Sequence, residues 1–401
     1  MTARLRELAR RQEGPAVEFA SRLIQTSSMP GKEGDVAALI QREMAALGYD
    51  DVSVDGAGNV IGVVRGSGGG PTVMFNTHMD HVSPGNPAAW TVDPFSGVVR
   101  DGFLWGRGAV DIKGPLACQV HGVGMLRGAN LRPRGDVFVV CVVQEEVGGV
   151  GTRYLVEHLR ADRAVVGEPS SNSLTRGHRG RMELIVEVRG RSAHASMPAR
   201  GVNPHYVLST FLESLRHLPM AEHHLLGAST VAPTLYQTDQ TSSNVIPAVC
   251  RLYLDWRNIP GESPEEVLDV LTPLLNAALT EGSAGEITVR SDQLTTYTGH
   301  QVLYGALFPA FETPADHVVV TGARHALETA LERPVAVGVW PFATDGGHLM
   351  QAGIPTVGFA PGDVAMCHVA DERISIAQMV EALAGNAALA LHLTDPQVVG
   401  E

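Results

Sequence analysis

Three apolar runs in this chain are each followed directly by polar side chains of the kinds that bind metal ions. In chain order they are Thr72–Asn76 with His78 and Asp80, Asp136–Val143 with Glu145 and Glu146, and Arg163–Val166 with Glu168. Imidazole and carboxylate groups are ligands of zinc and similar divalent cations. A carboxylate next to a bound water can also act as a general base. These residue types at these positions therefore predict metal-assisted hydrolysis.

Two further candidate ligands lie near other runs. His368 comes after Thr356–Phe359 and its Pro-Gly loop, and Asp111 lies in a glycine-rich loop that begins at Trp105. In an open parallel sheet, ligands bind beyond the carboxyl ends of the strands. If the apolar runs are neighbouring strands, all these groups converge at one edge of the sheet.

Each of these residues also has an ordinary interpretation. A histidine at a strand end is often a loop or capping residue, and Glu145 and Glu146 could be acids at a helix N-terminus. Asp111 could simply form a turn. Independent loop residues, however, need not gather at one sheet edge, so the joint pattern favours a metal site. Motifs for a helical zinc site, a serine nucleophile or a phosphate-binding loop are absent from the sequence.

The elements that must position these residues follow an α/β pattern. In the first 180 residues and again after about residue 295, strand-like runs alternate with helical ones, which predicts a mostly parallel sheet covered by helices on both faces. Between them, the order strand, helix, strand, strand, helix, strand predicts a smaller α+β insert. We therefore expect a catalytic domain at residues 1–179 and 294–401, interrupted by a lid or dimerisation domain at residues 180–293.

Composition limits the class of protein. The chain has 401 residues, enough for two or three domains, with 44% hydrophobic and 18% charged residues. Its formal net charge of −13 argues against binding to nucleic acid or to an anionic membrane as the main function. The four cysteines are far apart in the sequence and imply no disulfide framework, and no signal-peptide or membrane-spanning stretch is visible. A cytoplasmic location is the expectation.

At this point the chain resembles a known family. The blocks His78-Met-Asp80, Gly106 to Gly114, Glu145-Glu146, Gly167-Glu168-Pro169 and Cys367 to Glu372 are similar to the signature motifs of the di-zinc amidohydrolases and exopeptidases. That family includes acetylornithine deacetylase, succinyl-diaminopimelate desuccinylase, aminoacylase and glutamate carboxypeptidase. The insert motifs around His194 and Asn244 fit the same family. The segment 176–182, with Thr344 to Gly347, resembles the branch called selenium-metabolism-linked hydrolases.

The resemblance implies roles for the residues at the sheet edge. One zinc would be held by His78 and Glu168 and the other by Glu146 and His368, with Asp111 bridging the two. Two zinc ions per subunit are expected, and cobalt or manganese could serve in the same site. Glu145 would be the general base, and Asp80 would hydrogen-bond the imidazole of His78.

The resemblance also implies roles for residues outside this edge. His194 would donate a hydrogen bond to the oxyanion from the partner subunit, which requires a homodimer. Asn244, Arg257 and Gly346 would contact the substrate. Two of these residues have alternatives: His194 could close a turn before Pro198, and Arg257 could pair with Asp255.

The substrate is less well defined. Glu168 stands where several relatives that act as di- and tripeptidases carry Asp, which favours hydrolysis of a small N-acyl amino acid. A dipeptidase or carboxypeptidase using the same site is the alternative. Arg176, Arg179 and Arg181 could bind a substrate carboxylate or could be solvent-facing charges at a hinge. A further alternative is a metal-binding or scaffold protein that has the same fold but no catalytic activity. The presence of Glu145 and His194 argues against it.

Overall fold

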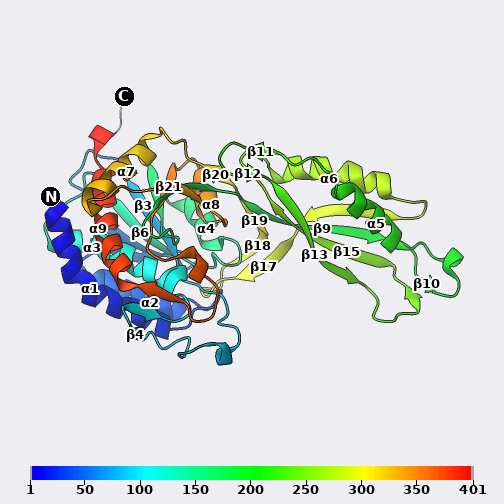
Figure 1. Ribbon diagram of the computed structural model, residues 1–401, viewed down its shortest axis with the longest axis horizontal. Helices are drawn as coiled ribbons and strands as arrows, with labels where there is room; N and C mark the ends of the chain where they lie inside the picture. Colours follow the sequence, from blue (N-terminus) through cyan, green and yellow to red (C-terminus); the bar gives the residue numbers. More distant parts are fainter. Residues whose placement is uncertain (1, 399–401) are drawn as a thin grey trace. The chain divides into compact units, whose positions relative to one another are not determined.

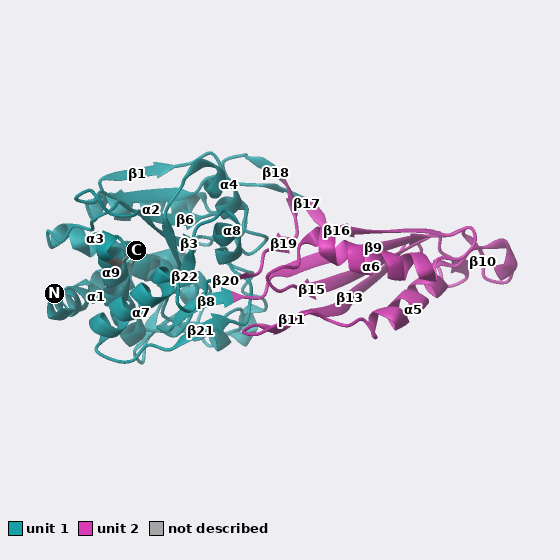
Figure 2. Ribbon diagram, turned by 90° about the horizontal axis from the view of Figure 1, so that it is seen from above, with its two compact units in different colours: residues 1–177, 293–302, 312–401 teal, residues 178–292, 303–311 magenta. Residues whose placement is uncertain are grey.

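The computed structural model describes residues 2–398, and the chain divides into two compact units (Figures 1 and 2). Unit 1 comprises residues 1–177, 293–302 and 312–401, and unit 2 comprises residues 178–292 and 303–311. Residues 303–311 belong to unit 2 because β19 (Leu307–Phe308) pairs with a strand of that unit, whereas the sequence pattern assigned them to the catalytic domain.

Unit 1 is built on a mixed sheet. Its strand order runs β1-β2-β6-β3-β7-β22-β8. The bounds of these strands are Asp51–Val54 (β1), Val60–Val64 (β2), Val137–Val142 (β6), Val73–His78 (β3), Arg163–Val166 (β7), Thr356–Gly358 (β22) and Leu174–His178 (β8). The four central strands β6, β3, β7 and β22 are parallel, and β1, β2 and β8 add antiparallel edges. The fold class predicted from sequence is therefore confirmed, with a sheet that is parallel at its centre.

Helices flank this sheet. They are α1 (Thr2–Gln25), α2 (Gly34–Ala46), α3 (Gly114–Gly128), α4 (Val150–His158), α7 (Val318–Leu331), α8 (Gly346–Gln351) and α9 (Ile376–His392). Helices α1, α3, α7 and α9 pack on one another, and α3 is buried on nearly all sides because it also contacts β3 and β6. The apolar faces of these helices and the central strands form one continuous core.

Unit 2 has a core of its own. Its sheet has the order β13-β15-β9-β16, with all neighbours antiparallel. The strands are β9 (Arg181–Arg189), β13 (Thr230–Thr238), β15 (Val249–Arg257) and β16 (Ala284–Val289). Buried residues alternate with more exposed ones along β9 and β15, as expected for a sheet with one covered face. Helices α5 (Pro204–Leu215) and α6 (Pro264–Ala278) pack together and supply apolar residues to this core.

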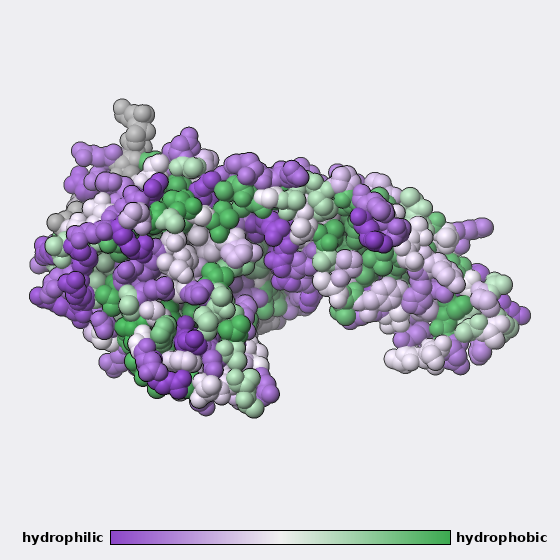
Figure 3. Space-filling view, viewed as in Figure 1, coloured by the Kyte–Doolittle hydropathy of each residue, from purple (hydrophilic) through white to green (hydrophobic). Residues whose placement is uncertain are grey.

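Short elements complete the chain. They are β4 (Val99–Arg100), β5 (Phe103–Trp105), β10 (Ala193–His194), β11 (Glu222–His223), β12 (Gly227–Ala228), β14 (Val245–Ile246), β17 (Ser291–Thr295), β18 (Gln301–Gly305), β20 (Phe311–Glu312), β21 (Val337–Trp340) and β23 (Arg373–Ser375). Within the described part of the chain, no helix combines the length and apolar character needed to cross a membrane. On the face shown in Figure 3, hydrophobic residues lie in small groups among hydrophilic ones.

Candidate metal centre

The carboxyl ends of three adjacent parallel strands carry the predicted residues. His78 ends β3, Glu145 and Glu146 follow β6, and Glu168 follows β7. The pairing of β3 with β6 continues to His78 opposite Val142, so His78 is the last residue of the strand. The sequence pattern was wrong in placing it after the strand, because the polar side chains of Thr77 and His78 hid the continued pairing. Since the strands are parallel and adjacent, these side chains share one sheet edge.

Two imidazoles lie on either side of one carboxylate at this edge. Nε2 of His78 is 3.1 Å from Oδ1 of Asp111, and Nε2 of His368 is 3.1 Å from Oδ2 of the same residue. His78 Nε2 is also 3.4 Å from Oε1 of Glu168, and His368 Nε2 is 3.1 Å from Oε1 of Glu146. Asp111 therefore lies between a His78–Glu168 pair and a His368–Glu146 pair, and all five predicted metal ligands come together.

The ring of His78 is oriented by Asp80. Nδ1 of His78 lies 3.0 Å from the backbone carbonyl oxygen of Asp80 and 3.4 Å from its carboxylate. These contacts engage Nδ1, so Nε2 is the ring nitrogen directed at Asp111 and Glu168 and available to a metal ion when the ring is neutral. The Asp80 carboxylate also accepts hydrogen bonds from the backbone N–H groups of Glu145 and Glu146, at 3.0 and 3.1 Å. One buried acid thus connects the His78 loop to the Glu145–Glu146 loop.

The loop that carries Asp111 is held by a residue to which we gave no role from sequence. The fully buried carboxylate of Glu372 accepts hydrogen bonds from the backbone N–H groups of Gly108, Val110 and Asp111, at 2.8 to 3.1 Å. It also forms a buried ion pair with Arg107 at 2.6 Å. The sequence signal was an acid four residues after His368, but its partners became visible only when the two loops were seen to pack together.

Burial and crowding shape the charges of this cluster. Burial, assisted by neighbouring carboxylates, raises the pKa of Glu145 well above its usual value and that of Glu168 to about 7, and it also raises the pKa of Glu146. Hydrogen bonds with Asp111 and Glu146 raise the pKa of His368 to about 10. The pKa of Asp111 is lowered, because the two imidazoles outweigh the effect of its burial. Each charge in the cluster therefore depends on its neighbours.

The donor set fits a pair of divalent cations. Four buried or nearly buried carboxylates and two imidazoles meet here, and within residues 2–398 no lysine or arginine side chain forms an ion pair with those carboxylates. Ligand atoms of His78, Asp111 and Glu146 lie within 4.8 Å of one another, as do those of His78, Glu145 and Glu168. Uncompensated buried charge is costly, and bound cations would offset it. Mixed nitrogen and oxygen donors suit zinc and related metals.

His194 and Asn244 lie beside each other in unit 2. β10 pairs with β14, and the backbone N–H of Ala195 donates to the carbonyl oxygen of Asn244 at 2.9 Å. Both His194 and Asn244 are exposed. Nδ1 of His194 accepts from the backbone N–H of Ser196 at 3.1 Å, so a neutral ring carries its proton on Nε2. An exposed Nε2–H is a suitable hydrogen-bond donor to a substrate.

The remaining predicted residues are engaged within their own units. Arg257 and Arg181 both bond the carboxylate of Asp255, at 2.6 and 2.9 Å. In unit 1, Arg176 forms an ion pair with Glu312. These pairings favour a structural role over capture of a substrate carboxylate. The Arg179 guanidinium donates to the carbonyl oxygen of Ala228.

Gly346 begins α8 and is buried, with its N–H donating to the hydroxyl of Thr344 at 3.0 Å. The preceding Asp345 is also buried and accepts a hydrogen bond from Thr152 at 2.6 Å. Burial raises the pKa of Asp345 to about 6. The charge of Asp345 also contributes to the raised pKa of Glu145, a proximity that the sequence does not reveal.

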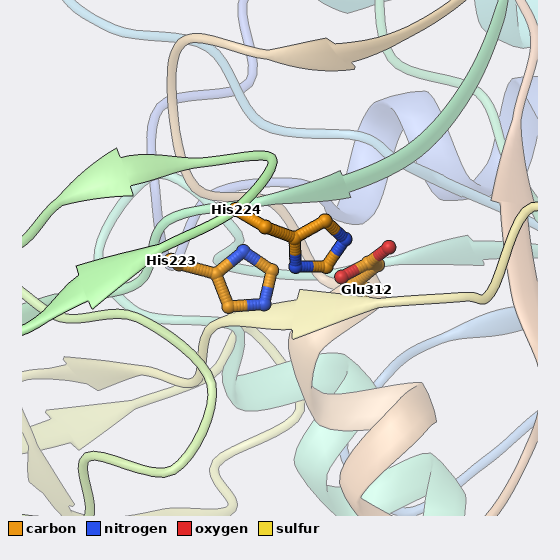
Figure 4. A group of neighbouring side chains, drawn as sticks. All are labelled: His223, His224 and Glu312. Atoms are coloured by element: carbon orange, nitrogen blue, oxygen red, sulfur yellow. The ribbon is translucent and has the colours of Figure 1, made fainter.

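A second histidine pair lies outside this cluster. His223 and His224, labelled in Figure 4, are consecutive residues at the β11–β12 hairpin of unit 2, with ring centroids 4.5 Å apart. Nδ1 of His223 accepts hydrogen bonds from the backbone N–H groups of Leu225 and Leu226, both at 3.3 Å. These bonds orient the ring of His223 within its own hairpin.

Comparisons with known proteins agree with this chemistry. Residues 74–392 match peptidase family M20/M25/M40. The chain is 29% identical over 392 residues to the uncharacterized protein YgeY of Escherichia coli, covering 96% of each chain. It is 31% identical over 341 residues to acetylornithine deacetylase of Myxococcus xanthus, covering 82% of each. It is 30% identical over 383 residues to succinyl-diaminopimelate desuccinylase of Cereibacter sphaeroides, covering 90% of this chain and 94% of the relative.

Solved structures share the fold. Aminopeptidase PepT of Bacillus cereus matches with a TM-score of 0.76 at 20% identity, covering 96% of this chain and 99% of the other. The YXEP protein of Bacillus subtilis, described as a dinuclear metal-binding peptidase, matches with a TM-score of 0.72 at 16% identity, covering 96% and 99%. The fold and the family match together define a metallohydrolase that acts on amide bonds. The chain belongs to peptidase family M20/M25/M40.

The crowded carboxylates predict a pH dependence for the metal-free protein. The pKa of Glu168 is raised from 4.5 to about 7, so the unfolded chain releases this proton more readily than the folded one. Its contribution to stability is present below pH 4.5 and is lost as the pH rises through 7. Glu168→Gln should therefore stabilise the metal-free protein at pH 8 by more than about 1 kcal/mol, since each pKa unit corresponds to about 1.4 kcal/mol.

Urea unfolding of chelator-treated protein at pH 5, 6, 7 and 8 measures this effect. The exposed Glu157, changed to Gln, is the matched control and should leave the pH dependence unchanged. Parallel pH curves for the wild type and Glu168→Gln would contradict the electrostatic account.

Proposed function

We propose that this protein hydrolyses the amide bond of small N-acyl amino acids with the help of two divalent metal ions. The observation that carries the proposal is the position of Asp111 between two imidazoles, each beside a further carboxylate. The relatives that share about 30% identity with the chain include a deacetylase and a desuccinylase. Glu168, in place of the Asp of several peptidases, favours the same substrate class.

In this proposal His78 and Glu168 would hold one metal ion, and Glu146 and His368 would hold the other. Asp111 offers one oxygen to each side, which suits a bridging carboxylate. Zinc is the metal we propose, since mixed histidine and carboxylate ligands suit it, with cobalt and manganese as substitutes. Two bound cations would lower the pKa of a water between them and polarise the substrate carbonyl.

Glu145 is the proposed general base. It is buried beside His78 and Glu168, and its own backbone N–H donates to the carboxylate of Asp80. As a carboxylate it could accept the proton of the attacking water and later return it to the leaving amine. His194 is proposed to donate its Nε2–H to the carbonyl oxygen as negative charge develops there. Asn244 and Gly346 stay as proposed substrate contacts, whereas the pairing of Arg257 with Asp255 favours a structural role for that arginine.

Hydrolysis of a panel of substrates tests the function. Chelator-stripped protein would be assayed with N-acetyl and N-succinyl amino acids and with dipeptides, before and after addition of zinc, manganese or cobalt. We expect metal-dependent cleavage of N-acyl amino acids. Cleavage of dipeptides alone would favour the dipeptidase alternative, and a protein that binds no metal and cleaves nothing would contradict the proposal.

The role of Glu145 can be tested separately from metal binding. Glu145→Gln should retain two metal ions per chain and lower kcat at least ~100-fold, because the amide cannot accept a proton. Metal content measured by atomic emission and steady-state kinetics would check both parts, with Glu157→Gln as a control. Near-normal turnover in Glu145→Gln would remove this residue from the mechanism.

We also propose a homodimer in which His194 serves the site of the partner. β13 is an edge strand of the unit 2 sheet, and a bare edge can pair with another chain. Leu235 and Tyr236 on this strand are 48% and 40% exposed, and Tyr206 on α5 is 72% exposed. Such exposed apolar side chains beside an open edge are typical of an interface. A cytoplasmic location stays a prediction.

A charge on that edge should disrupt the dimer. Leu235→Lys should shift the protein from about twice its 42.6 kDa chain mass to a monomer in light scattering. Activity should fall while the metal content stays the same, because the proposed ligands all lie in unit 1. Thr272→Lys, an exposed change on α6, which packs against β16 at the opposite edge of the sheet, is the control. A fully active monomer would contradict a shared His194.

A further inference from the structure

The segment Thr26–Glu33, which joins α1 to α2, contacts three loops that carry proposed ligands. The carbonyl oxygen of Thr26 accepts from Nζ of the buried Lys113, two residues after Asp111, at 2.7 Å. The hydroxyl of Ser28 donates to the carbonyl oxygen of Met79, next to His78, at 2.7 Å. The segment therefore connects the Asp111 loop with the His78 loop.

Glu33 makes the connection to the third loop. Its side chain is fully buried, and Oε1 accepts hydrogen bonds from the backbone N–H of Gly31 at 2.9 Å and of Gln144 at 3.3 Å. Gln144 directly precedes the Glu145–Glu146 pair. A carboxylate at the start of α2 thus holds the residue that leads into the proposed base and ligand.

The backbone at Gln144 needs such support. Its φ is +53°, a left-handed conformation that is costly for a side chain other than glycine. The Gln144 side chain donates to the carbonyl oxygen of Thr295 at 2.9 Å. Gly31 lies so close that an added Cβ would be 3.1 Å from Nε2 of Gln144. The side chain of Gln144 is therefore held by Thr295 and lies against Gly31.

Two acids together hold three successive backbone N–H groups. Glu33 accepts from Gln144, and Asp80 accepts from Glu145 and Glu146. A buried N–H left without an acceptor is unfavourable, so removal of either acid should let the loop move. Neither carboxylate is itself among the proposed metal ligands.

We propose that Glu33 is a positioning residue for the Glu145–Glu146 loop. Through this loop it sets the affinity of the site for the metal ion that Glu146 and His368 would hold. This inference rests on the proposed function in that Glu146 is taken as a ligand. Glu33 acts through the backbone of Gln144 and contacts neither metal nor substrate. Its acceptor oxygen is the essential feature, and its charge is not.

The charge is dispensable because the environment already disfavours it. Oε2 of Glu33 is buried and makes no hydrogen bond within residues 2–398. Burial, with the nearby charge of Asp80, raises the pKa of Glu33 to about 7. Glutamine keeps a carbonyl oxygen in the same place and should therefore keep the hydrogen bonds from Gly31 and Gln144.

Three variants test this proposal. Glu33→Ala removes the acceptor, Glu33→Gln keeps it, and Glu43→Gln is a matched control on the same helix, where Glu43 pairs with Arg22 and His121. Zinc affinity would be measured by competition with a chromogenic chelator. Amide hydrogen exchange of peptides covering residues 140–150 would be measured on metal-free protein. If Glu33→Ala does not fold, Glu33→Met fills the same space without an acceptor.

We expect Glu33→Ala to weaken binding of one zinc ion by about 10-fold or more and to speed exchange at residues 144–146. Glu33→Gln should stay within about threefold of the wild type in both measurements, and Glu43→Gln should match the wild type. With a substrate that the wild type cleaves, Glu33→Ala should lower kcat about 10-fold or more and change KM by less than about threefold.

Wild-type zinc affinity and wild-type exchange in Glu33→Ala would overturn the proposal. So would equal losses in Glu33→Ala and Glu33→Gln, or faster exchange spread evenly over unit 1, because these indicate a general structural role. If the wild type binds two zinc ions but cleaves no substrate, the proposed hydrolysis is wrong. The zinc-affinity and hydrogen-exchange measurements then still test the positioning role of Glu33. If the wild type binds no zinc, the proposal for Glu33 fails together with the metal site.

Discussion

The structure of unit 1 is organised around the electrostatic cost of placing several carboxylates together out of water. Asp111, Glu145, Glu146 and Glu168 converge at one sheet edge, and the only positive partners they meet there within the described residues are the imidazoles of His78 and His368. Such a cluster is unfavourable in an apolar interior unless cations or hydrogen-bond donors compensate it. The raised pKa values of Glu145, Glu146 and Glu168 are the direct expression of this cost. The same arrangement would give divalent cations a strong and specific site.

A second set of acids keeps the first set in place. Three carboxylates, those of Asp80, Glu372 and Glu33, accept hydrogen bonds from backbone N–H groups of the loops that carry the proposed ligands. These hydrogen bonds, at 2.8 to 3.3 Å, tie each loop to an acid from elsewhere in the sequence. Strands β3, β6 and β7 bring the loops to one edge, and these acids then set the position of each ligand within its loop. Catalysis by positioned groups depends on such small distances.

The sequence predicted much of the fold because its signals are local. Apolar runs at strand spacing and helical periodicity were enough to predict the parallel centre of the sheet and the α+β insert. The convergence of His78, Glu146 and Glu168 followed from one rule about strand ends. The family itself was recognised from the motif blocks and is confirmed by the match over residues 74–392.

What could not be predicted depends on contacts between distant segments. Glu372 lies more than 250 residues from the Asp111 loop that it holds, and Glu33 lies more than 100 residues from Gln144. No periodicity or spacing rule links such pairs. The pairing of Arg257 with Asp255 is different, since the sequence suggested it as one of two alternatives and the side-chain geometry favours it over substrate binding.

The most direct test of this account is the number and place of metal ions bound by unit 1. A crystal of the zinc-loaded protein, with anomalous scattering measured at the zinc edge, would reveal them. The account predicts two peaks, one on each side of the Asp111 carboxylate, near His78 with Glu168 and near His368 with Glu146. A single peak away from Asp111, or none at saturating zinc, would contradict the central claim that these buried acids form a two-metal centre.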